Sequence, residues 1–281
     1  MKVYKDVSFL FCFPRVLIMT LAVLTSQKSF SSSFPIIAEA IIVRGSVTFL
    51  SIPQKKADKL KKGSKIRQGT SIVTGKNSFV RLKFKNGSLL SLGSNSKIVV
   101  YNIGKKKTGI VSLIEGKLRS KVEKKLEGQD FFVKTRTAAL GVRGTEFQTI
   151  YNRDNKITSM LTYDGKVQVV KVDPKIKKKP KVIPKTDKDL LESRGLELKE
   201  ELKSKTAQGV DKGQYVGISP NVNKASFPVK ISPVQFTALY NNDELKKEEE
   251  ISKGVDKNGE LIEQVEQKAP LEGFRNRKTG S

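Results

Sequence analysis

Residues 131–151 read Phe-Phe-Val-Lys-Thr-Arg-Thr-Ala-Ala-Leu-Gly-Val-Arg-Gly-Thr-Glu-Phe-Gln-Thr-Ile-Tyr, and their pattern indicates two strands that meet at a corner. Residues of β propensity alternate with other residues before the corner, from Phe131 to Thr135, and again after it, from Thr145 to Tyr151. Side chains that alternate with a period of two are typical of a β-strand with one buried face. The segment therefore predicts β structure on both sides of a short junction.

The junction is Arg143-Gly144-Thr145, and glycines at positions 141 and 144 allow the sharp turn that it needs. A further turn, Asp164-Gly165, leads into a last strand. Arg143 has two interpretations: it anchors an anionic ligand, or it closes the fold by pairing with Glu146 or by donating to strand-end carbonyls. We predict the structural role, because the alternation around the junction marks it as part of the core.

Upstream, turn signals recur nine residues apart, at Asn77-Ser78, Asn86-Gly87-Ser88 and Asn95-Ser96. This spacing fits either consecutive hairpins or the rungs of a small β-solenoid. Other expected elements are a strand over residues 41–52 and two strands, 110–114 and 118–122, paired through a turn at Glu115-Gly116. About ten short strands in 130 residues predict an all-β domain, built as a β-solenoid or a β-sandwich.

The chain divides into five predicted segments. A basic start, an uncharged run over residues 16–25 and the small-x-small motif Ala38-Glu39-Ala40 predict a cleaved export signal, with an uncleaved membrane anchor as the alternative. Proline and lysine after Val172 predict an extended linker. The segments are a signal peptide (1–40), the β domain (41–172), a linker (173–188), a short helix within 190–205 with a returning edge strand at 213–218 (189–240), and a disordered charged tail (241–281).

Residue usage restricts the chemistry. The chain has no histidine and one cysteine, Cys12, which lies inside the predicted signal. We therefore expect no disulfide, no metal, no cofactor and no imidazole-based catalysis. Eight carboxylates fall in the β domain, mostly at predicted turns, without the spacing that places two across a cleft. The prediction is a non-enzymatic protein, and a cell-wall enzyme that uses carboxylates remains the catalytic alternative.

The predicted β domain is strongly basic: residues 41–170 carry 27 Lys and Arg against 8 Asp and Glu, a net charge of +19. In the cytoplasm such charge would suggest nucleic acid, but export disfavours that partner and favours an anionic envelope lipid or polymer, or another envelope protein. The alternative is a set of lysines that only solubilise exposed strand faces. Six residues are the candidate contacts with an anionic surface: Arg81, Lys83, Lys85, Lys105, Lys106 and Lys107. Tyr101, Tyr151 and Tyr163 are either stacking platforms among these charges or packing residues.

Taken in order, these motifs resemble the FecR domain over about residues 41–172. The series includes Ile72-Val73-Thr74-Gly75, Asn86-Gly87-Ser88-Leu89-Leu90, Val133-Lys134-Thr135 and the signature Arg143-Gly144-Thr145-Glu146. The resemblance implies a β-rich module outside the cytoplasmic membrane, in the periplasm or otherwise exported, which acts by protein interaction, scaffolding or sensing. It also implies an alternative role as a membrane-anchored regulator of an extracytoplasmic sigma factor, although only about 15 residues precede the apolar run.

Overall fold

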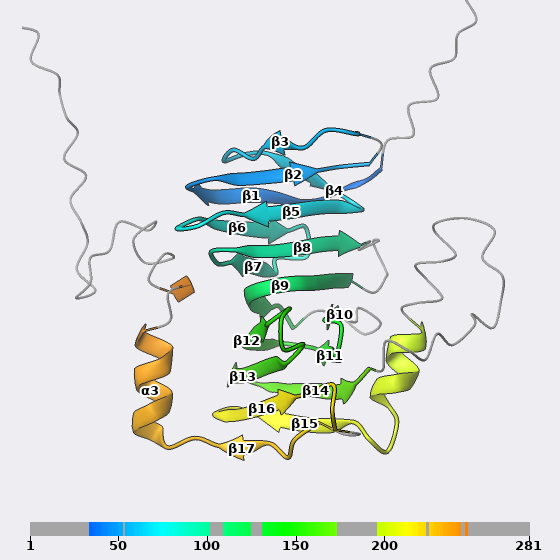
Figure 1. Cartoon of the computed structure of the whole chain (residues 1–281), viewed down its shortest axis with the longest axis vertical. Coiled ribbons are helices and arrows are strands. Elements are labelled where there is room, and N and C mark those ends of the chain that lie inside the picture. Colours follow the sequence, from blue (N-terminus) through cyan, green and yellow to red (C-terminus); the bar gives the residue numbers. More distant parts are fainter. Residues whose placement is uncertain are drawn as a thin grey trace, which may run out of the picture. The chain divides into compact units, whose positions relative to one another are not determined.

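Short strands separated by Gly, Asn and Ser turns make up most of the structure (Figure 1). The computed structural model describes residues 34–52, 54–101, 109–124, 131–172, 196–222, 225–242 and 245–246. The described residues from Pro35 onwards belong to one compact unit. The prediction of an all-β fold is confirmed.

The strands form two sheets that share one strand, β9. The first sheet consists, in hydrogen-bonded order, of β4 (Lys65–Arg67), β1 (Ile36–Arg44), β6 (Phe79–Phe84), β7 (Leu89–Leu92), β9 (Gly109–Val122), β12 (Thr145–Tyr151), β13 (Thr158–Asp164), β16 (Gln214–Ile218) and β17 (Val229–Lys230). The second sheet consists of β3 (Asp58–Lys59), β2 (Val47–Leu50), β5 (Thr70–Thr74), β8 (Ser96–Tyr101), β9, β10 (Phe131–Lys134), β11 (Ala138–Val142), β14 (Lys166–Lys171) and β15 (Gln208–Asp211).

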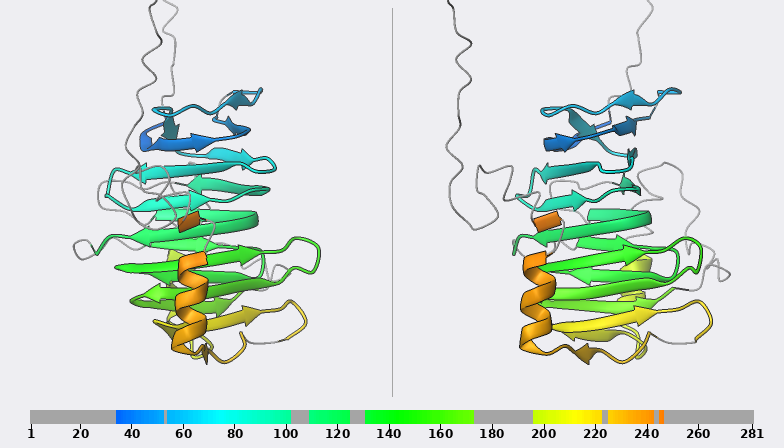
Figure 2. Two further views of the ribbon diagram at one scale, coloured as in Figure 1. Left: turned by 90° about the vertical axis from the view of Figure 1, so that its left-hand side faces the viewer. Right: turned by 60° about the vertical axis from the view of Figure 1, so that its left-hand side comes forward.

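The chain adds strands alternately to the two sheets, so that the strand order in each sheet nearly follows the order in the sequence (Figures 1 and 2). Every pairing between described strands is antiparallel except that of β9 with β10, which is parallel. The fold therefore combines the two predicted architectures: two sheets enclose a core, as in a sandwich, while the chain advances along the stack as in a solenoid.

One hydrophobic cluster lies between the sheets. Leu82 and Phe147 come from the first sheet and Ile98 and Leu140 from the second, and all four are almost completely buried. The alternation predicted from the sequence produces this core, because most in-facing residues of the strands are apolar. A buried side chain of this size contributes about 1.5–3 kcal/mol to folding before the conformational entropy is counted.

The strand β9 changes sheet at Gly116, so the predicted hairpin at Glu115-Gly116 is wrong. Residues 110–115 pair with β8 in the second sheet, and residues from Gly116 onwards pair with β12 in the first. Gly116 has φ +92°, and a Cβ there would lie 2.1 Å from Ser96 Oγ. The Ser96 hydroxyl instead accepts a hydrogen bond from the amide of Lys117 at 2.9 Å. The glycine thus permits a sharp bend within one strand, not a reversal of the chain.

The corner at Arg143-Gly144 carries the chain from β11 in the second sheet to β12 in the first. Gly144 has φ +62°, as expected of a turn glycine. Gly141, in contrast, lies within β11, and the predicted turn at that position is wrong. The reason for a glycine there is packing, because a Cβ would come 2.7 Å from Leu202 Cδ1 in the helix of residues 196–202.

At the beginning of the fold, the predicted strand over residues 41–52 is two strands, β1 and β2, separated by Gly45 with φ +71°. The first of them begins at Ile36, five residues before the predicted domain start, and Ala38 and Ala40 are buried in it. Small in-facing residues of a strand thus produce the same pattern as a cleavage motif. Residues 1–33 lie outside the described residues, and cleavage remains a prediction.

The C-terminal part holds two helices in its described residues. One covers residues 196–202, within the predicted helix. The other, α3 (Pro233–Asn242), is not expected from the sequence pattern and runs across the strands of the first sheet (Figure 2). Leu245 beyond it is buried against Gly93, so the predicted disordered tail does not start at residue 241. Residues 173–195 and 247–281, with the predicted linker and most of the tail, lie outside the described residues.

The returning strand predicted at residues 213–218 is β16, which pairs with β13 on one side and with the short β17 on the other. In the part of the chain that the structure describes, no helix is both long and apolar enough to cross a membrane.

Candidate functional site

The change of sheet within β9 opens a fork between its two neighbours. On one edge, β9 pairs with β10 as far as Ser112, which lies opposite Lys134. On the same edge it pairs with β12 only from Gly116, which lies opposite Tyr151. Among the described residues, no strand pairs with residues 113–115 of β9 on this edge, because β10 and β12 diverge into different sheets. A cleft of about 400 Å³ occupies the fork.

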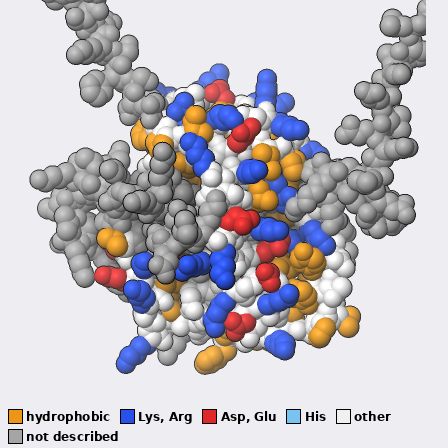
Figure 3. All heavy atoms as spheres, turned by 180° about the vertical axis from the view of Figure 1, so that it is seen from behind, with side chains coloured by type: hydrophobic (Ala, Val, Ile, Leu, Met, Phe, Trp, Pro, Cys, Tyr) orange, Lys and Arg blue, Asp and Glu red, His pale blue; other side chains and the backbone are white. Residues whose placement is uncertain are grey.

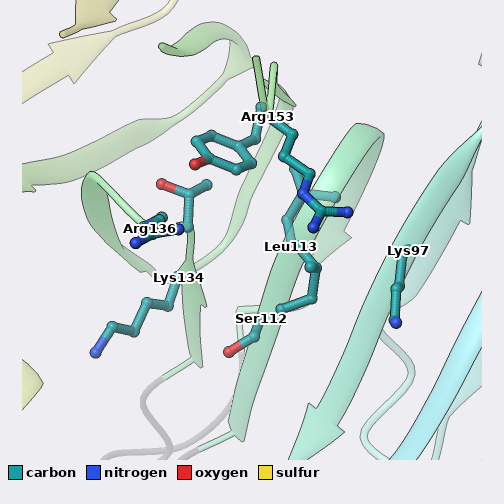
Figure 4. A pocket seen from close by; sticks show the side chains of 9 residues that line it. Lys97, Ser112, Leu113, Lys134, Arg136 and Arg153 are labelled. Carbon is teal, nitrogen blue, oxygen red and sulfur yellow. The ribbon is translucent and has the colours of Figure 1, made fainter. Parts of the chain in front are cut away.

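The cleft has β9 as its floor and the ends of β10 and β12 as its walls (Figure 4). Lys134 and Arg136 stand on one side of β9, Lys97 of β8 stands on the other, and Arg153 reaches over Leu113 (Figure 4). The residues that line the cleft are Lys97, Ser112, Leu113, Ile114, Lys134, Thr135, Arg136, Tyr151 and Arg153.

Arg136 lies at the tip of a tight turn between β10 and β11. The Thr135 hydroxyl accepts hydrogen bonds from the amides of Ala138, at 2.9 Å, and Thr137, at 3.2 Å. The backbone amide of Thr135 in turn donates to the carbonyl of Ala138 at 2.9 Å. Thr158, the first residue of β13, holds this turn through hydroxyl contacts of 2.7 Å to Thr135 and 2.8 Å to Thr137. The backbone that carries Arg136 is therefore fixed on the wall of the cleft.

Arg153 lies in the turn between β12 and β13. The side-chain oxygen of Asn152 accepts hydrogen bonds from the backbone amides of Asp154, at 2.8 Å, and Asn155, at 3.3 Å. This arrangement is an Asx turn. Arg153 Nη1 lies 3.7 Å from Glu115 Oε2, and the Arg153 side chain is 72% exposed. A pair this open contributes little to stability. The guanidinium of Arg153 can therefore change partner at small cost.

Tyr151 ends β12 on its core-facing side and is only 3% exposed. Its hydroxyl is buried and has no hydrogen-bond partner among the described residues. Burial raises the pKa of Tyr151 above its ordinary value of 10.0, and the nearby Arg136 and Arg153 oppose this shift. The neutral hydroxyl is thus kept as a donor at the edge of the cleft, although a buried polar group without a partner costs stability.

The lining contains four cationic side chains and no carboxylate. Lys134 is half-buried, so its charge is less screened by water than that of a free surface lysine. Cations on opposite walls of a concave site produce a positive potential between them, and this favours a negatively charged group. The arrangement is thus suited to hold an anion.

The six predicted contacts with an anionic surface differ in their exposure. Arg81 is buried, and its Nε donates to Ser91 Oγ at 2.8 Å, so the prediction that it is exposed is wrong. Lys83 and Lys85 are exposed as predicted, although neither lines the cleft. Lys105, Lys106 and Lys107 lie outside the described residues. On the face seen in Figure 3, Lys and Arg side chains are scattered over the surface with Asp and Glu between them.

The residues of the signature Arg143-Gly144-Thr145-Glu146 also lie in different environments. Arg143 is exposed, and Glu146 pairs with Arg119 of β9 instead, at 2.7 Å. Of the two structural alternatives for Arg143, the pairing with Glu146 is therefore wrong. Glu146 lies on the outer face of β12, where the neighbouring strand presents Arg119, whereas Arg143 lies in the corner before the strand begins. Thr145 is buried as the first residue of β12.

Sequence reasoning missed the cations of the cleft. Lys134, Arg136 and Arg153 are ordinary basic residues in their local sequence, and only the divergence of β10 and β12 brings them together. Of the two interpretations of Tyr151, a stacking platform or a packing residue, its burial fits the second. A signal was nevertheless present, because Arg136 and Arg153 both lie in turns rich in Thr or Asn.

Residues 70–168 match the family model described as FecR protein, which is about a third of the chain. The matched range runs from the start of β5 into β14 and includes every residue that lines the cleft. A search of curated protein sequences finds no match.

Two crystal structures of a candidate anti-sigma factor from Parabacteroides distasonis are similar to the chain, each with 14% sequence identity and a TM-score of 0.42. The similar region includes 61% of this chain. It includes 64% of the first solved chain and 65% of the second, so this chain matches less than two thirds of their length. A structure described as a cell surface anchoring domain has 29% identity and a TM-score of 0.23, and covers 25% of this chain and 97% of its own.

Proposed function

We propose that the chain, in which residues 70–168 match the FecR family model, is a non-catalytic binding module of the cell envelope and that its cleft receives an anionic group of the ligand. The chain is exported on its N-terminal segment, and the ligand is an envelope protein or an anionic envelope polymer or lipid. The single observation that carries the proposal is the set of four cations, without a carboxylate, around the cleft where β10 and β12 diverge.

The geometry of the cleft supports recognition. The turns that carry Arg136 and Arg153 are fixed by side-chain hydrogen bonds, so the backbone at the two arginines needs little ordering when a ligand binds. The cleft is open to solvent on the side of Arg136 and Arg153, both of which are exposed. A ligand group can therefore enter the cleft without a rearrangement of the sheets.

The described carboxylates support a non-catalytic role. Several are already paired with cations: Glu146 with Arg119, Asp211 with Lys166 at 3.3 Å, Asp164 with Lys212 at 3.7 Å and Glu115 with Arg153. In each of these pairs the carboxylate contacts a cation, and no described carboxylate lines the cleft. Within the described ranges no cluster of His, Cys, Asp and Glu residues could hold a metal ion.

The test uses the full-length protein with phosphatidylglycerol vesicles and with purified peptidoglycan, in a sedimentation assay at low and physiological salt. The double variant Arg136→Gln/Arg153→Gln should bind at least one of these materials with about tenfold lower affinity, measured from the fraction of protein that sediments with the material. The matched control Lys83→Gln/Lys85→Gln removes the same charge from exposed positions outside the cleft and should have a small effect. Equal losses for the two double variants would show that diffuse charge, not the cleft, is responsible.

A further inference from the structure

We propose that the ligand of the cleft is an acidic peptide segment of a partner protein, which lies extended beside residues 113–115 of β9 and places a carboxylate between Arg136 and Arg153. The inference rests on the proposed function, because it names the class of ligand that the same cleft takes. It adds a mode of binding: the backbone of the segment continues the interrupted second sheet, and its acidic side chain provides specificity.

The first argument is the free edge of β9. β10 ends at Lys134, opposite Ser112, while β9 continues to Gly116 before it gains β12 as a neighbour. On the other edge, residues 113–115 are covered by β8, from Leu113 opposite Ile98 to Glu115 opposite Lys97. One edge of this stretch is thus paired and the other faces the cleft. A strand edge of this kind is a template for an added segment of extended chain.

The second argument is the position of the two arginines. Arg136 comes from the turn after β10 and Arg153 from the turn after β12, on opposite walls of the same cleft. A carboxylate between them can accept hydrogen bonds from both guanidinium groups, and such charge-assisted bonds are about twice as strong as neutral ones. Glu115, 3.7 Å from Arg153, shows that a carboxylate already approaches this guanidinium from within the chain.

The third argument is the buried hydroxyl of Tyr151. This group lines the cleft, is hidden from solvent and has no acceptor among the described residues. Buried hydroxyl groups nearly always have a hydrogen-bond partner, so an unpaired one beside two arginines fits an acceptor that the described residues do not provide. A ligand carboxylate provides such an acceptor, and the raised pKa of Tyr151 keeps the hydroxyl able to donate.

The composition of the floor favours a peptide over a phosphate polymer. Ile114 is an exposed apolar residue of the floor, with 38% of its surface accessible, and Leu113 lies beside it. A polyanion needs a row of cations that follows its backbone. The four cations of the cleft instead surround a short floor with an apolar residue in its middle. An extended peptide can place an apolar side chain over Ile114 and its acidic side chain between the arginines.

The experiment measures fluorescence anisotropy of full-length protein with a labelled peptide, acetyl-Val-Thr-Glu-Val-Thr-amide, and with its Gln counterpart. We expect the Gln peptide to bind about tenfold more weakly, because one charge-assisted contact is lost. A third peptide with N-methylated amides at alternate positions should also bind at least about tenfold more weakly, since it cannot extend the sheet. The protein variants Arg136→Gln/Arg153→Gln and Tyr151→Phe should bind the Glu peptide more weakly than the unmodified protein does. The variant Lys83→Gln/Lys85→Gln should bind it equally well.

The outcomes separate this inference from the proposed function. If the Glu, Gln and N-methylated peptides bind equally or not at all, while vesicles or peptidoglycan still require Arg136 and Arg153, the peptide inference is overturned and the anion-binding function stands. If the arginine double variant binds the peptides, the vesicles and peptidoglycan as well as the unmodified protein does, both proposals fail. Binding that needs the Glu side chain but tolerates N-methylation would also overturn the inference, because it would exclude strand addition.

Discussion

Arg119 of β9 and Glu146 of β12 form an ion pair on the outer face of the first sheet, in which Nε and Nη2 lie 3.0 and 2.7 Å from the same oxygen, Oε1. The Arg119 side chain is 3% exposed. Its guanidinium carbon lies 4.5 Å from the ring centroid of Tyr163 and 5.1 Å from that of Tyr240 in α3. One arginine thus connects β9, β12, β13 and the C-terminal helix.

Replacing Arg119 by Met should lower the free energy of unfolding by about 3 kcal/mol, because Glu146 loses its partner while largely shielded from water. Urea denaturation of the full-length protein measures the change. Arg143→Ala is the control, since Arg143 is exposed, and it should change the free energy by less than about 0.5 kcal/mol. A larger effect at Arg143 than at Arg119 would contradict the roles that the structure gives to these two residues.

Gly116→Ala should destabilise the protein by at least about 2 kcal/mol, because it combines an unfavourable positive φ with overlap against Ser96. Gly63→Ala is a matched control, because Gly63 has φ +85° and an added Cβ there would meet no atom within 4 Å. The control should cost only the backbone strain, about 1 kcal/mol. Thermal denaturation compares the two variants. Equal losses would mean that the bend of β9 does not depend on the contact with Ser96.

Tyr151→Phe should raise the free energy of unfolding by up to about 1 kcal/mol, because it removes a buried hydroxyl that has no partner among the described residues. The same change should weaken binding of the acidic peptide. Denaturation and anisotropy on the same preparation test both effects together. A variant that is less stable than the unmodified protein would show that the hydroxyl makes a stabilising contact in the free protein.

The pH dependence of stability gives an independent test of Tyr151. Its pKa is raised in the folded state, mainly by burial, so the unfolded chain loses this proton first, near pH 10.0. The folded state therefore prefers the protonated hydroxyl of Tyr151. The free energy of unfolding that this preference contributes is complete below that pH and is lost as the pH rises through the folded pKa. As the pH rises above about 10, stability should therefore fall less steeply for Tyr151→Phe than for the unmodified protein. Parallel curves would contradict the shift.

Much of the fold could be predicted from local pattern. The asparagine turns lie between strands as expected, and Asn77 and Asn95 have φ of 52° and 50°, which suits a turn residue. The bend at Gly116 cannot be told from a hairpin in the sequence, because a glycine after a charged residue looks the same in both cases. α3 could not be predicted, because it is stabilised by contacts of Phe236 and Tyr240 with Tyr163, which its own sequence does not reveal.

The site could not be predicted in the same way. Arg81 alternates with apolar residues, which predicts a solvent-exposed face, but Ser91 and the neighbouring strands bury it. The cations of the cleft come from two strands and two turns, and their proximity depends on where β10 and β12 separate. Strand order is a long-range property, so local alternation identifies which face a residue occupies but not its neighbours.

Amide hydrogen exchange of the full-length protein, with and without the acidic peptide, tests the central claim most directly. If the cleft at the fork of β10 and β12 is the binding site, the peptide should slow exchange of the amides in residues 113–115 that face the fork, and the arginine double variant should abolish this protection. Unchanged exchange in residues 113–115, together with slower exchange at the strands around Lys83, would place the binding site elsewhere and contradict the account.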